Sequence, residues 1–474
     1  MIATRTMASV LALCTAALAP VLSFAQDFSF DEEALFGSEE NLVDSSASSS
    51  SADALSSLLV YESVRISGSF AGSLGAEWAW NDPWSGFRVS EPDSYGLTPS
   101  ASLRLGMDAR PSEDMRVYGQ LRMAWPFEQS VSVLTGATYV DPAPAPLDPF
   151  VSTTSTSLTQ LNLSVFELFS DFNMGDRLFF RFGKQTVAWG VGYFFSPADV
   201  LNLEAIDPLN PGEQREGPLT LRAHWPLMGT QHNLWAYAVF DSPEMKPEDI
   251  ALAAKAEFAI GSWELGVGGW LKRERPERMM LTAAGSVGKV SLFGEASLSH
   301  GSDRLWVDSI GMGGPVLVGD EHSWFFKGTA GFMWQQSDWH LTMAGQYLYD
   351  GEGYENATRD ALIEDAHAVL GSTAASNPLF KLLIAGSGRH YAALSATLAE
   401  FLHEDLSLSL FGMGNLSDFS GFARLSLGWR MFTGMSLNAN ASFAFGVKDS
   451  EYLVLNDGPA IRLGLALNLG SASF

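Results

Sequence analysis

The chain has 474 residues, of which 46% are apolar and 17% charged, and its formal net charge is −26 at pH 7. This acidity excludes a nucleic-acid-binding protein, because phosphate backbones are bound by basic surfaces. The length alone would allow a few soluble domains, but no change in composition divides the chain. Low charge density with a mean hydropathy of +0.07 is typical of a membrane barrel, in which apolar residues alternate with polar ones.

Residues 1–25 predict a secretory signal peptide. Arg5 provides the basic start, residues 7–22 the apolar core, and Ser23-Phe24-Ala25 a small-x-small site for cleavage near Ala25. The only cysteine, Cys14, lies inside this segment; acylation at Cys14, as in a lipoprotein, is the alternative, and the large Leu13 before it argues against that. No later apolar run reaches the roughly 18 residues of a transmembrane helix.

Residues 26–62 predict a disordered, acidic, serine-rich periplasmic tail. Between Asp27 and Glu62 there are nine carboxylates and no basic residue. Such a segment cannot bury enough apolar surface to offset the entropy that ordering costs. A tail that binds a partner is the alternative.

Residues 63–474 predict a closed antiparallel transmembrane β-barrel of about 18 strands (16 to 18). The clearest strand is 461–469, where large aliphatic residues occupy every odd position, and side chains two apart share one face of a strand. Strands are expected at 64–80, 102–110, 115–125, 157–171, 177–189, 218–226, 232–241, 250–261, 263–272, 277–287, 289–300, 323–336, 338–350, 389–401, 404–413, 420–431, 434–446 and 459–470.

The connections alternate in length, as they do in outer-membrane barrels with short periplasmic turns and long external loops. Long loops are expected at 81–98, 128–155, 190–217, 301–322, 351–388 and 447–458. Aromatic residues at strand ends predict rings at the lipid headgroups: Trp80, Trp125, Trp189, Trp225, Trp334, Trp339, Tyr349 and Trp429.

The segment 356–386 breaks the strand period. Residues 357–370 predict a short helix within the longest loop, because apolar residues such as Leu362 and Val369 lie among the carboxylates Asp360, Glu364 and Asp365. The loop either folds into the mouth and narrows the pore or forms a surface lid.

Polar residues opposite the apolar faces predict the pore lining. An arginine facing lipid at mid-depth would cost roughly 2–4 kcal/mol, so the basic side chains should face the lumen, where rows of Arg and Lys favour anions. The alternative is a structural ion-pair network. The predicted lining residues are Arg104, Asp108, Arg116, Arg122, Arg181, Gln185, Arg222, His224, Lys327, His340, Arg424 and Arg462, with Lys255, Glu257, Glu295, Gln346 and Arg430 also on the inner face.

One stretch carries a family resemblance. Arg181-Phe-Gly-Lys184-Gln185, Trp189-Gly190, Phe195-Ser-Pro197 and Glu213 to Pro218 resemble a strand and long loop of Gram-negative outer-membrane porin-like barrel proteins. The match covers about 40 residues, and Asn202-Leu203 stands where those proteins often have Asn-Pro. The resemblance implies a barrel that is a channel. The chain departs from the usual C-terminal ending, since Phe474 is out of phase with 463–469 unless the strand is bulged or bent.

The sequence therefore predicts an outer-membrane porin or channel for passive diffusion of small hydrophilic solutes, with a basic constriction that favours anions. The alternatives are a gated, substrate-specific transporter, a surface adhesin and, least favoured, an outer-membrane hydrolase. No catalytic set, cofactor or metal site is expected, since no Ser, His and carboxylate stand at a telling spacing and no close His pair occurs. The expected partners are outer-membrane lipid, the solutes and the barrel-assembly machinery. A homo-oligomer is an open alternative.

Overall fold

The computed structural model describes residues 60–61, 64–81, 83, 91–125, 128–135, 152–159, 162–175, 177–203, 205–240, 246–311, 314–371, 378–456 and 458–473. The signal peptide expected at 1–25 and nearly all of the tail expected at 26–62 lie outside these residues and stay predictions. The last two described residues of the tail form β1 (Val60–Tyr61), which pairs with the start of the first long strand.

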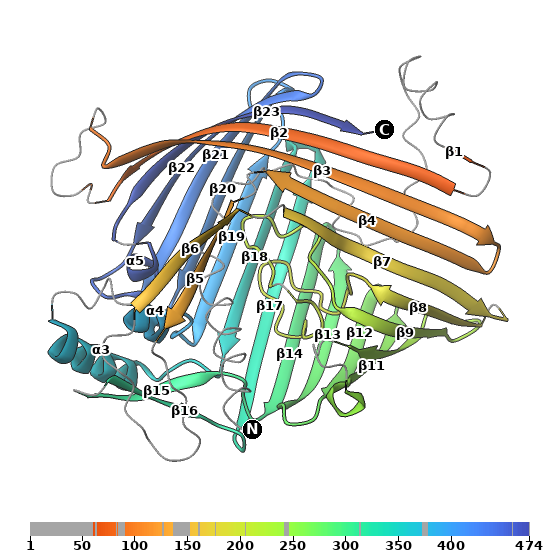
Figure 1. Ribbon diagram of the computed structural model, residues 1–474, viewed down its shortest axis with the longest axis horizontal. Coiled ribbons are helices and arrows are strands. Elements are labelled where there is room, and N and C mark those ends of the chain that lie inside the picture. Colours follow the sequence, from red (N-terminus) through yellow and green to blue (C-terminus); the bar gives the residue numbers. More distant parts are fainter. Residues whose placement is uncertain are drawn as a thin grey trace.

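Eighteen strands among the described residues form one closed antiparallel barrel (Figure 1). In chain order they are β2 (Val64–Trp80), β3 (Ser94–Ser112), β4 (Met115–Trp125), β7 (Asn162–Met174), β8 (Leu178–Lys184), β9 (Leu219–Pro226), β10 (Asn233–Val239), β11 (Ala251–Ile260), β12 (Trp263–Leu271), β13 (Glu277–Val287), β14 (Val290–His300), β17 (Trp324–Gln336), β18 (Leu341–Asp350), β19 (His390–Leu398), β20 (Leu406–Asn415), β21 (Ser420–Phe432), β22 (Met435–Phe445) and β23 (Ile461–Ser473). Each strand pairs with the next, and β2 pairs with β23 to close the wall. The predicted fold class is confirmed.

Antiparallel order places the connections at two opposite ends of the barrel. One, which we call the turn end, has the short connections 113–114, 175–177, 227–232, 261–262, 288–289, 337–340, 399–405 and 433–434. The other, the loop end, has most of the long ones. The 3₁₀ turn η3 (Ser337–Trp339) delays the start of β18 to Leu341, so the strand expected from 338 begins three residues later.

Two of the expected loops contain hairpins. One hairpin consists of strands β5 (Glu128–Thr135) and β6 (Ser152–Thr159), which pair only with each other. The other consists of strands β15 (Leu305–Gly311) and β16 (Gly314–Gly319), which also pair only with each other. The predicted strand 157–171 is therefore wrong at its start, which belongs to β6, and β3 begins well before the expected residue 102. Each hairpin is a separate two-stranded sheet, so neither changes the strand count of the barrel.

The loop helix is confirmed as α3 (Asn356–Leu370). It lies at the loop end with α4 (Pro378–Ile384), α5 (Glu451–Leu455) and the β15–β16 hairpin (Figure 1). We call this group the cap. Its shared apolar core comprises Val307, Tyr354, Leu362, Ala366, Phe380, Leu383, Ile384 and Val454. None of the described helices, including the 3₁₀ turn η2 (Pro247–Asp249), is long and apolar enough to cross a membrane.

A buried polar cluster ties the cap to the wall. The carboxylate of Glu451 accepts hydrogen bonds from Gly386 N–H at 2.8 Å, Tyr391 O–H at 2.9 Å and Asn415 Nδ2 at 2.7 Å. Asp418 accepts the Glu451 N–H at 2.9 Å and lies 3.6 Å from Arg359 Nη1. Burial raises the pKa of Glu451 to about 7, more than these hydrogen bonds lower it.

The outer surface of the wall carries the apolar half of each strand. Large exposed residues include Leu105 and Leu121 on neighbouring strands and Leu265, Leu281 and Leu425 farther round. Their sequence neighbours face the interior, where Thr282, Glu295 and Gln346 are buried. This is the inside-out distribution of a barrel surrounded by lipid.

Two of the expected headgroup aromatics are buried. Trp80 and Trp189 are buried, whereas Trp125, Trp225, Trp339 and Trp429 are exposed. Trp189 lies after β8, which ends at Lys184 instead of at the expected residue 189. It packs inside the barrel, as described below.

The final strand has the irregularity that the sequence required. The register of β23 against β2 shifts between Phe70 and Gly72, beside Gly470, whose φ is +64°. One extra residue there inverts which side chains face outward beyond Leu469. Phe474 itself lies outside the described residues.

Candidate functional site

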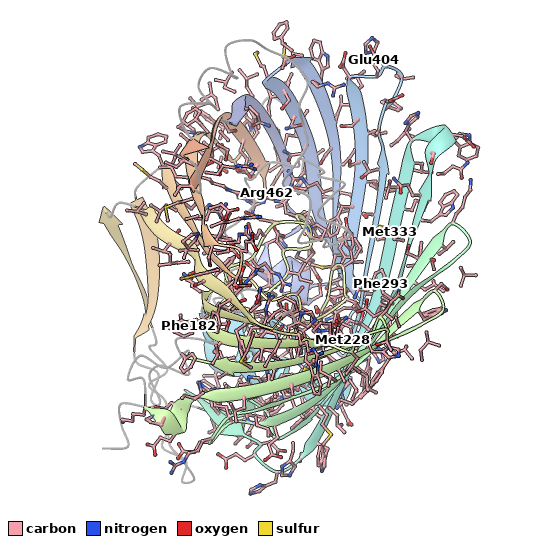
Figure 2. The ribbon with its side chains drawn as sticks, turned by 90° about the vertical axis from the view of Figure 1, so that its right-hand side faces the viewer. Phe182, Met228, Phe293, Met333, Glu404 and Arg462 are labelled. Atoms are coloured by element: carbon pink, nitrogen blue, oxygen red, sulfur yellow. The ribbon has the colours of Figure 1, made fainter. Side chains whose placement is uncertain are left out.

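The segment 185–218, between β8 and β9, folds into the barrel interior instead of standing beyond its rim. Figure 2 shows it as the yellow trace running between the walls. Its described residues, 185–203 and 205–218, form no helix and no strand, and the segment contacts strands on several sides of the lumen. We call it the lumen segment.

Glu295, on the inner face of β14, is the first anchor of the lumen segment. Its Oε1 accepts the N–H groups of Val191 and Gly192, both at 2.5 Å, and its Oε2 accepts the Ala198 N–H at 2.9 Å. The Ser196 hydroxyl donates to the same carboxylate at 3.0 Å. One buried carboxylate thus satisfies four donors that would otherwise be left without partners.

Gln346, on β18, is the second anchor. Its Oε1 accepts three consecutive N–H groups, those of residues 193–195, at 2.6–3.2 Å. Its Nε2 donates to the Phe195 carbonyl at 2.6 Å and to Thr329 Oγ1 at 2.7 Å. Since Thr329 is on β17, two wall strands fix the orientation of this amide.

Apolar contacts press the lumen segment against two stretches of the wall. Val187, Trp189, Ala198 and Leu201 pack with Tyr237, Val239, Ala251, Ala253, Trp270 and Met280 of β10–β13. Phe194 and Leu209 pack with Ala344, Ala393, Phe411 and Phe422 of β18–β21. The indole N–H of Trp189 donates to Met280 Sδ at 3.0 Å, and Lys255 Nζ donates to the Trp189 carbonyl at 2.9 Å.

Close backbone approach explains the glycines at the tip of the lumen segment. A Cβ at Gly190 would collide with the side chains of Ser196 and Glu295, and one at Gly192 with the Phe195 carbonyl. Larger residues at either position would displace the chain from its two anchors.

The lumen segment also makes electrostatic contacts with β4 and β21. Glu213 Oε1 lies 3.6 Å from Arg122 Nη2 of β4. Asp207 and, from β2, Glu77 interact electrostatically with Arg424 of β21, whose buried Nε has no hydrogen-bond partner. Within the lumen segment itself, Asp199 pairs with Arg215 at 2.5 Å.

The predicted lining residues near the turn end form a belt of close ion pairs. Arg116 Nε lies 3.0 Å from Asp108, and Arg181 lies 2.5 Å from Asp171 through Nε and 3.0 Å through Nη2. Arg116 also reaches Asp171 at 3.9 Å. These four side chains of β3, β4, β7 and β8 neutralise one another, which is the ion-pair network that the sequence left as an alternative.

Arg222 and His224 stand together on β9. The His224 ring stacks on Trp235 of β10 at 3.7 Å, and the Arg222 guanidinium lies 5.3 Å from the same indole. His224 Nε2 is 2.9 Å from Asn233 Oδ1. Trp235 in turn donates to Glu257 at 2.7 Å, and Glu257 pairs with Lys255 at 2.8 Å.

Four other predicted lining residues do not line the middle of the lumen. They lie outside a strand or form ion pairs at one end of the barrel. Lys327 pairs with Asp350 at 3.3 Å and Glu352 at 2.7 Å at the loop end. Gln185 is fully buried and donates to Thr220 at 2.6 Å. His340 follows η3 in the turn before β18 and pairs with Glu400 at 3.3 Å. Arg430 pairs with Asp405 at 3.1 Å at the turn end.

Arg104 and Arg462 complete the predicted set. Arg104 of β3 stands directly opposite Arg122, and Arg462 of β23 lies 3.8 Å from Glu77. Among the described residues these two arginines, like Arg122 and Arg424, have no carboxylate ion pair as close as those of Arg116 and Arg181. We call the four the loosely paired arginines.

Sequence reasoning missed the acids that face these arginines and the path of the lumen segment. Asp207 and Glu213 lie in a stretch expected as an external loop. A signal was present: Trp189 and the run Tyr193-Phe194-Phe195 are too apolar for a solvated loop. Glu295 and Gln346 were expected on the inner face, but nothing local marked them as anchors.

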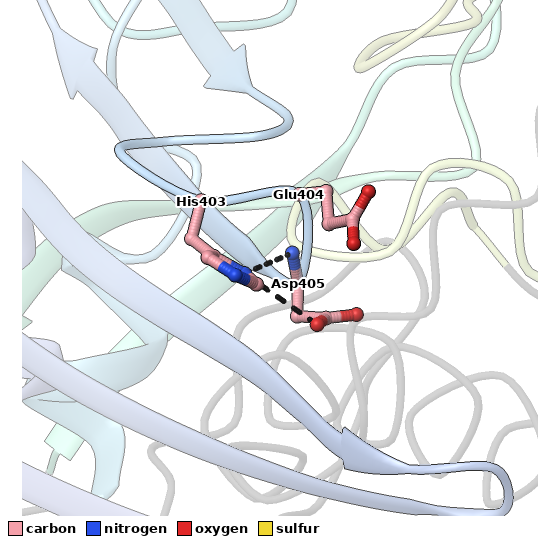
Figure 3. A group of neighbouring side chains, drawn as sticks. All are labelled: His403, Glu404 and Asp405. Carbon is pink, nitrogen blue, oxygen red and sulfur yellow. Dashed lines mark hydrogen bonds and ion pairs between the residues drawn. The ribbon is translucent and has the colours of Figure 1, made fainter.

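One turn brings together three residues of the types that bind metal ions. His403, Glu404 and Asp405 bring donor atoms within 4.8 Å of one another (Figure 3). His403 Nδ1 already accepts the Asp405 N–H at 3.3 Å, and the Asp405 carboxylate pairs with Arg430. Two of the three candidate ligands, His403 and Asp405, are thus already engaged, and we assign no metal to this turn.

No family model matches the chain, and no curated protein matches it. Solved structures similar to it include OccK8 (OprE) of Pseudomonas aeruginosa, 10% identical with a TM-score of 0.43 over 86% of this chain and 98% of that one. The outer membrane channel DcaP of Acinetobacter baumannii is 12% identical with a TM-score of 0.38 over 88% and 99%. OmpF of Salmonella typhi, in complex with daunomycin, is 7% identical with a TM-score of 0.38 over 86% and 97%. These low values carry no argument about function, and the porin-like resemblance around Arg181 stays a prediction.

Proposed function

We propose that this protein is an outer-membrane channel for passive diffusion of small hydrophilic solutes, with a preference for anions. The observation that carries the proposal is the lumen segment, which is held inside the barrel by Glu295 and Gln346 and narrows the interior. A polar interior with a fixed narrowing element is the arrangement expected of a selective pore.

The preference for anions rests on how the basic residues are paired. Arg116 and Arg181 are matched by close carboxylates and contribute little net field. Of the loosely paired arginines, Arg122 and Arg462 lie 3.6 and 3.8 Å from their nearest carboxylates, so their charge is less completely offset. We therefore assign the anion preference to the loosely paired arginines of β3, β4, β21 and β23.

The membrane setting follows from the outer surface and the expected export signal. The apolar outer faces of the strands suit contact with outer-membrane lipid, and residues 1–25 would direct the chain across the inner membrane. We further propose insertion by the barrel-assembly machinery, with homo-oligomers as an open alternative. We propose a channel and no enzyme, because the polar residues of the lumen serve as anchors and ion pairs.

Planar-bilayer recording of the purified full chain tests the channel. We expect discrete conductance steps and, in a potassium chloride gradient, a reversal potential that indicates chloride preference. A folded barrel that inserts into the bilayer and gives no steps would overturn the proposal.

Paired variants test the origin of the selectivity. A unit charge about 4 Å from an ion in water is worth roughly 1 kcal/mol, so replacing both Arg104 and Arg122 by Ser should lower chloride preference several-fold. The matched control, Asp171→Asn with Arg181→Gln, removes a close ion pair with no change in net charge and should leave the reversal potential unchanged. Equal effects of the two changes would refute the assignment to the loosely paired arginines.

A further inference from the structure

Four polar residues lie in one row across the inner wall, and two of them are arginines. Arg104 of β3 is the direct partner of Arg122 of β4. Ser69 of β2 is opposite Arg104 on one side, and Ser164 of β7 is opposite Arg122 on the other. Cross-strand partners share a face, so the order Ser69, Arg104, Arg122, Ser164 runs continuously over four strands. We call it the Ser-Arg-Arg-Ser row.

The central pair of the row is under-neutralised. Like charges directly opposite on neighbouring strands repel each other. Among the described residues Arg104 forms no ion pair, and the one ion pair of Arg122 is with Glu213 at 3.6 Å, beyond normal hydrogen-bond length. By contrast, Arg181 holds Asp171 through two hydrogen bonds of 2.5 and 3.0 Å. Two guanidinium charges and one carboxylate leave the row with a net charge of +1.

Glu213 belongs to the lumen segment and not to the wall. Its N–H donates to the Asn210 carbonyl at 2.9 Å in a turn of that segment, and its charge also acts on Arg104. A side chain carried by such a turn can leave the row without disturbing the pairing of β3 with β4. The carboxylate is therefore a tethered occupant of the row.

We propose that the Ser-Arg-Arg-Ser row is a binding subsite for the carboxylate group of a permeating solute, and that Glu213 occupies it as an internal competitor until the solute arrives. The inference rests on the channel function proposed above. Guanidinium groups present planar, paired donors that match carboxylate oxygens, and the two serine hydroxyls add donors at either end. The present occupant is itself a carboxylate, so the subsite is assigned to that chemistry.

The test measures inhibition of the chloride current by propionate, which reproduces the end of the glutamate side chain. A short flexible tether gives an effective concentration in the millimolar range, so removing the competitor with Glu213→Gln should lower the half-inhibiting propionate concentration by about fivefold or more. Glu216→Gln is the matched control. It removes the same charge three residues along the same segment, where Glu216 pairs with Lys184 of β8, and should leave inhibition unchanged. Propionamide, the neutral analogue, should not inhibit any variant.

A second variant keeps the test decisive if Glu213→Gln does not fold. Arg104→Gln in the otherwise unchanged chain should raise the half-inhibiting propionate concentration. Equal inhibition of the wild type, Glu213→Gln and Arg104→Gln, in channels that conduct and prefer chloride, would overturn the subsite and leave the channel standing. If Glu213→Gln lowers the half-inhibiting concentration of inorganic phosphate by the same factor as that of propionate, the assignment to carboxylates would be overturned. No current from any folded variant would refute the channel itself.

Discussion

The lumen segment and the cap are both long connections at the loop end, yet they are stabilised in opposite ways. The lumen segment has no helix or strand among the residues that the structure describes, and its shape is imposed by wall residues, chiefly Glu295 and Gln346. The cap has three helices, a hairpin and an apolar core of its own. Its polar link to the wall is concentrated at Glu451.

For the channel proposed above, this difference predicts that the lumen segment narrows the pore and that the cap does not. A segment without internal structure stays where the wall holds it, so a change in the wall alters the aperture directly. A segment with its own core can open or shift as a unit while the aperture stays the same. The three changes below test this division, from the largest expected effect to the smallest.

The largest effect should come from removing both anchors of the lumen segment. Glu295→Ala with Gln346→Ala leaves seven donors of residues 191–198 without their acceptors, each costing about 1–3 kcal/mol if it stays buried. The segment should detach, and single-channel conductance should rise several-fold. Glu264→Gln, a carboxylate change on β12, is the control. Unchanged conductance in the double variant would mean that the segment is not the narrowing element.

A smaller effect, confined to the cap, is expected from Phe380→Ala. Phe380 is 1% exposed in the cap core, and truncating a buried phenylalanine costs about 3–5 kcal/mol. Hydrogen exchange of α3 and α4 should accelerate while conductance stays at the wild-type value. Leu402→Ala, at a residue 86% exposed, should change neither. A large conductance change in Phe380→Ala would contradict the division between cap and lumen segment.

The smallest effect is a dependence of cap stability on pH. The pKa of Glu451 is about 7 in the folded cap, against an ordinary value of 4.5, so between these pH values the folded cap keeps a proton that the opened cap releases. The free energy of opening should therefore fall by about 3 kcal/mol as pH rises from 4.5 to 7 and then level off. Protection of the Gly386 amide, corrected for intrinsic exchange, measures it.

Glu451→Gln is the control for that dependence. The amide cannot ionise and keeps a carbonyl acceptor for Tyr391 or Asn415, so protection should no longer vary between pH 4.5 and 7. An unaltered pH profile in this variant would contradict the assignment of the pH dependence to Glu451.

The barrel could be predicted from sequence because its signal is local. Alternation in 461–469 or 64–80 needs only the neighbouring residues, and both stretches are strands. The helix at 357–370 was visible for the same reason. The hairpin β5–β6 was missed because β6 consists of Ser and Thr apart from Leu158 and therefore shows no apolar alternation.

The candidate site could be predicted only in part. Strand parity gave the inner face of Arg104 and Arg122, but not which arginines are neutralised, because Asp171 and Glu213 come from other strands and from the lumen segment. The course of that segment depends on Glu295 and Gln346, about 100 and 150 positions away along the chain. His340 was misplaced because η3 takes the residues before it out of the strand.

The pairing of β2 with β23 joins residues nearly four hundred positions apart. Every intermediate that lacks the C-terminal strand exposes two unsatisfied edges, which are templates for aggregation, and contacts so distant in sequence form slowly. The ribosome must therefore synthesise β23 before the barrel can close. A nascent chain truncated within the thirteen residues of β23 would have to be sheltered or destroyed.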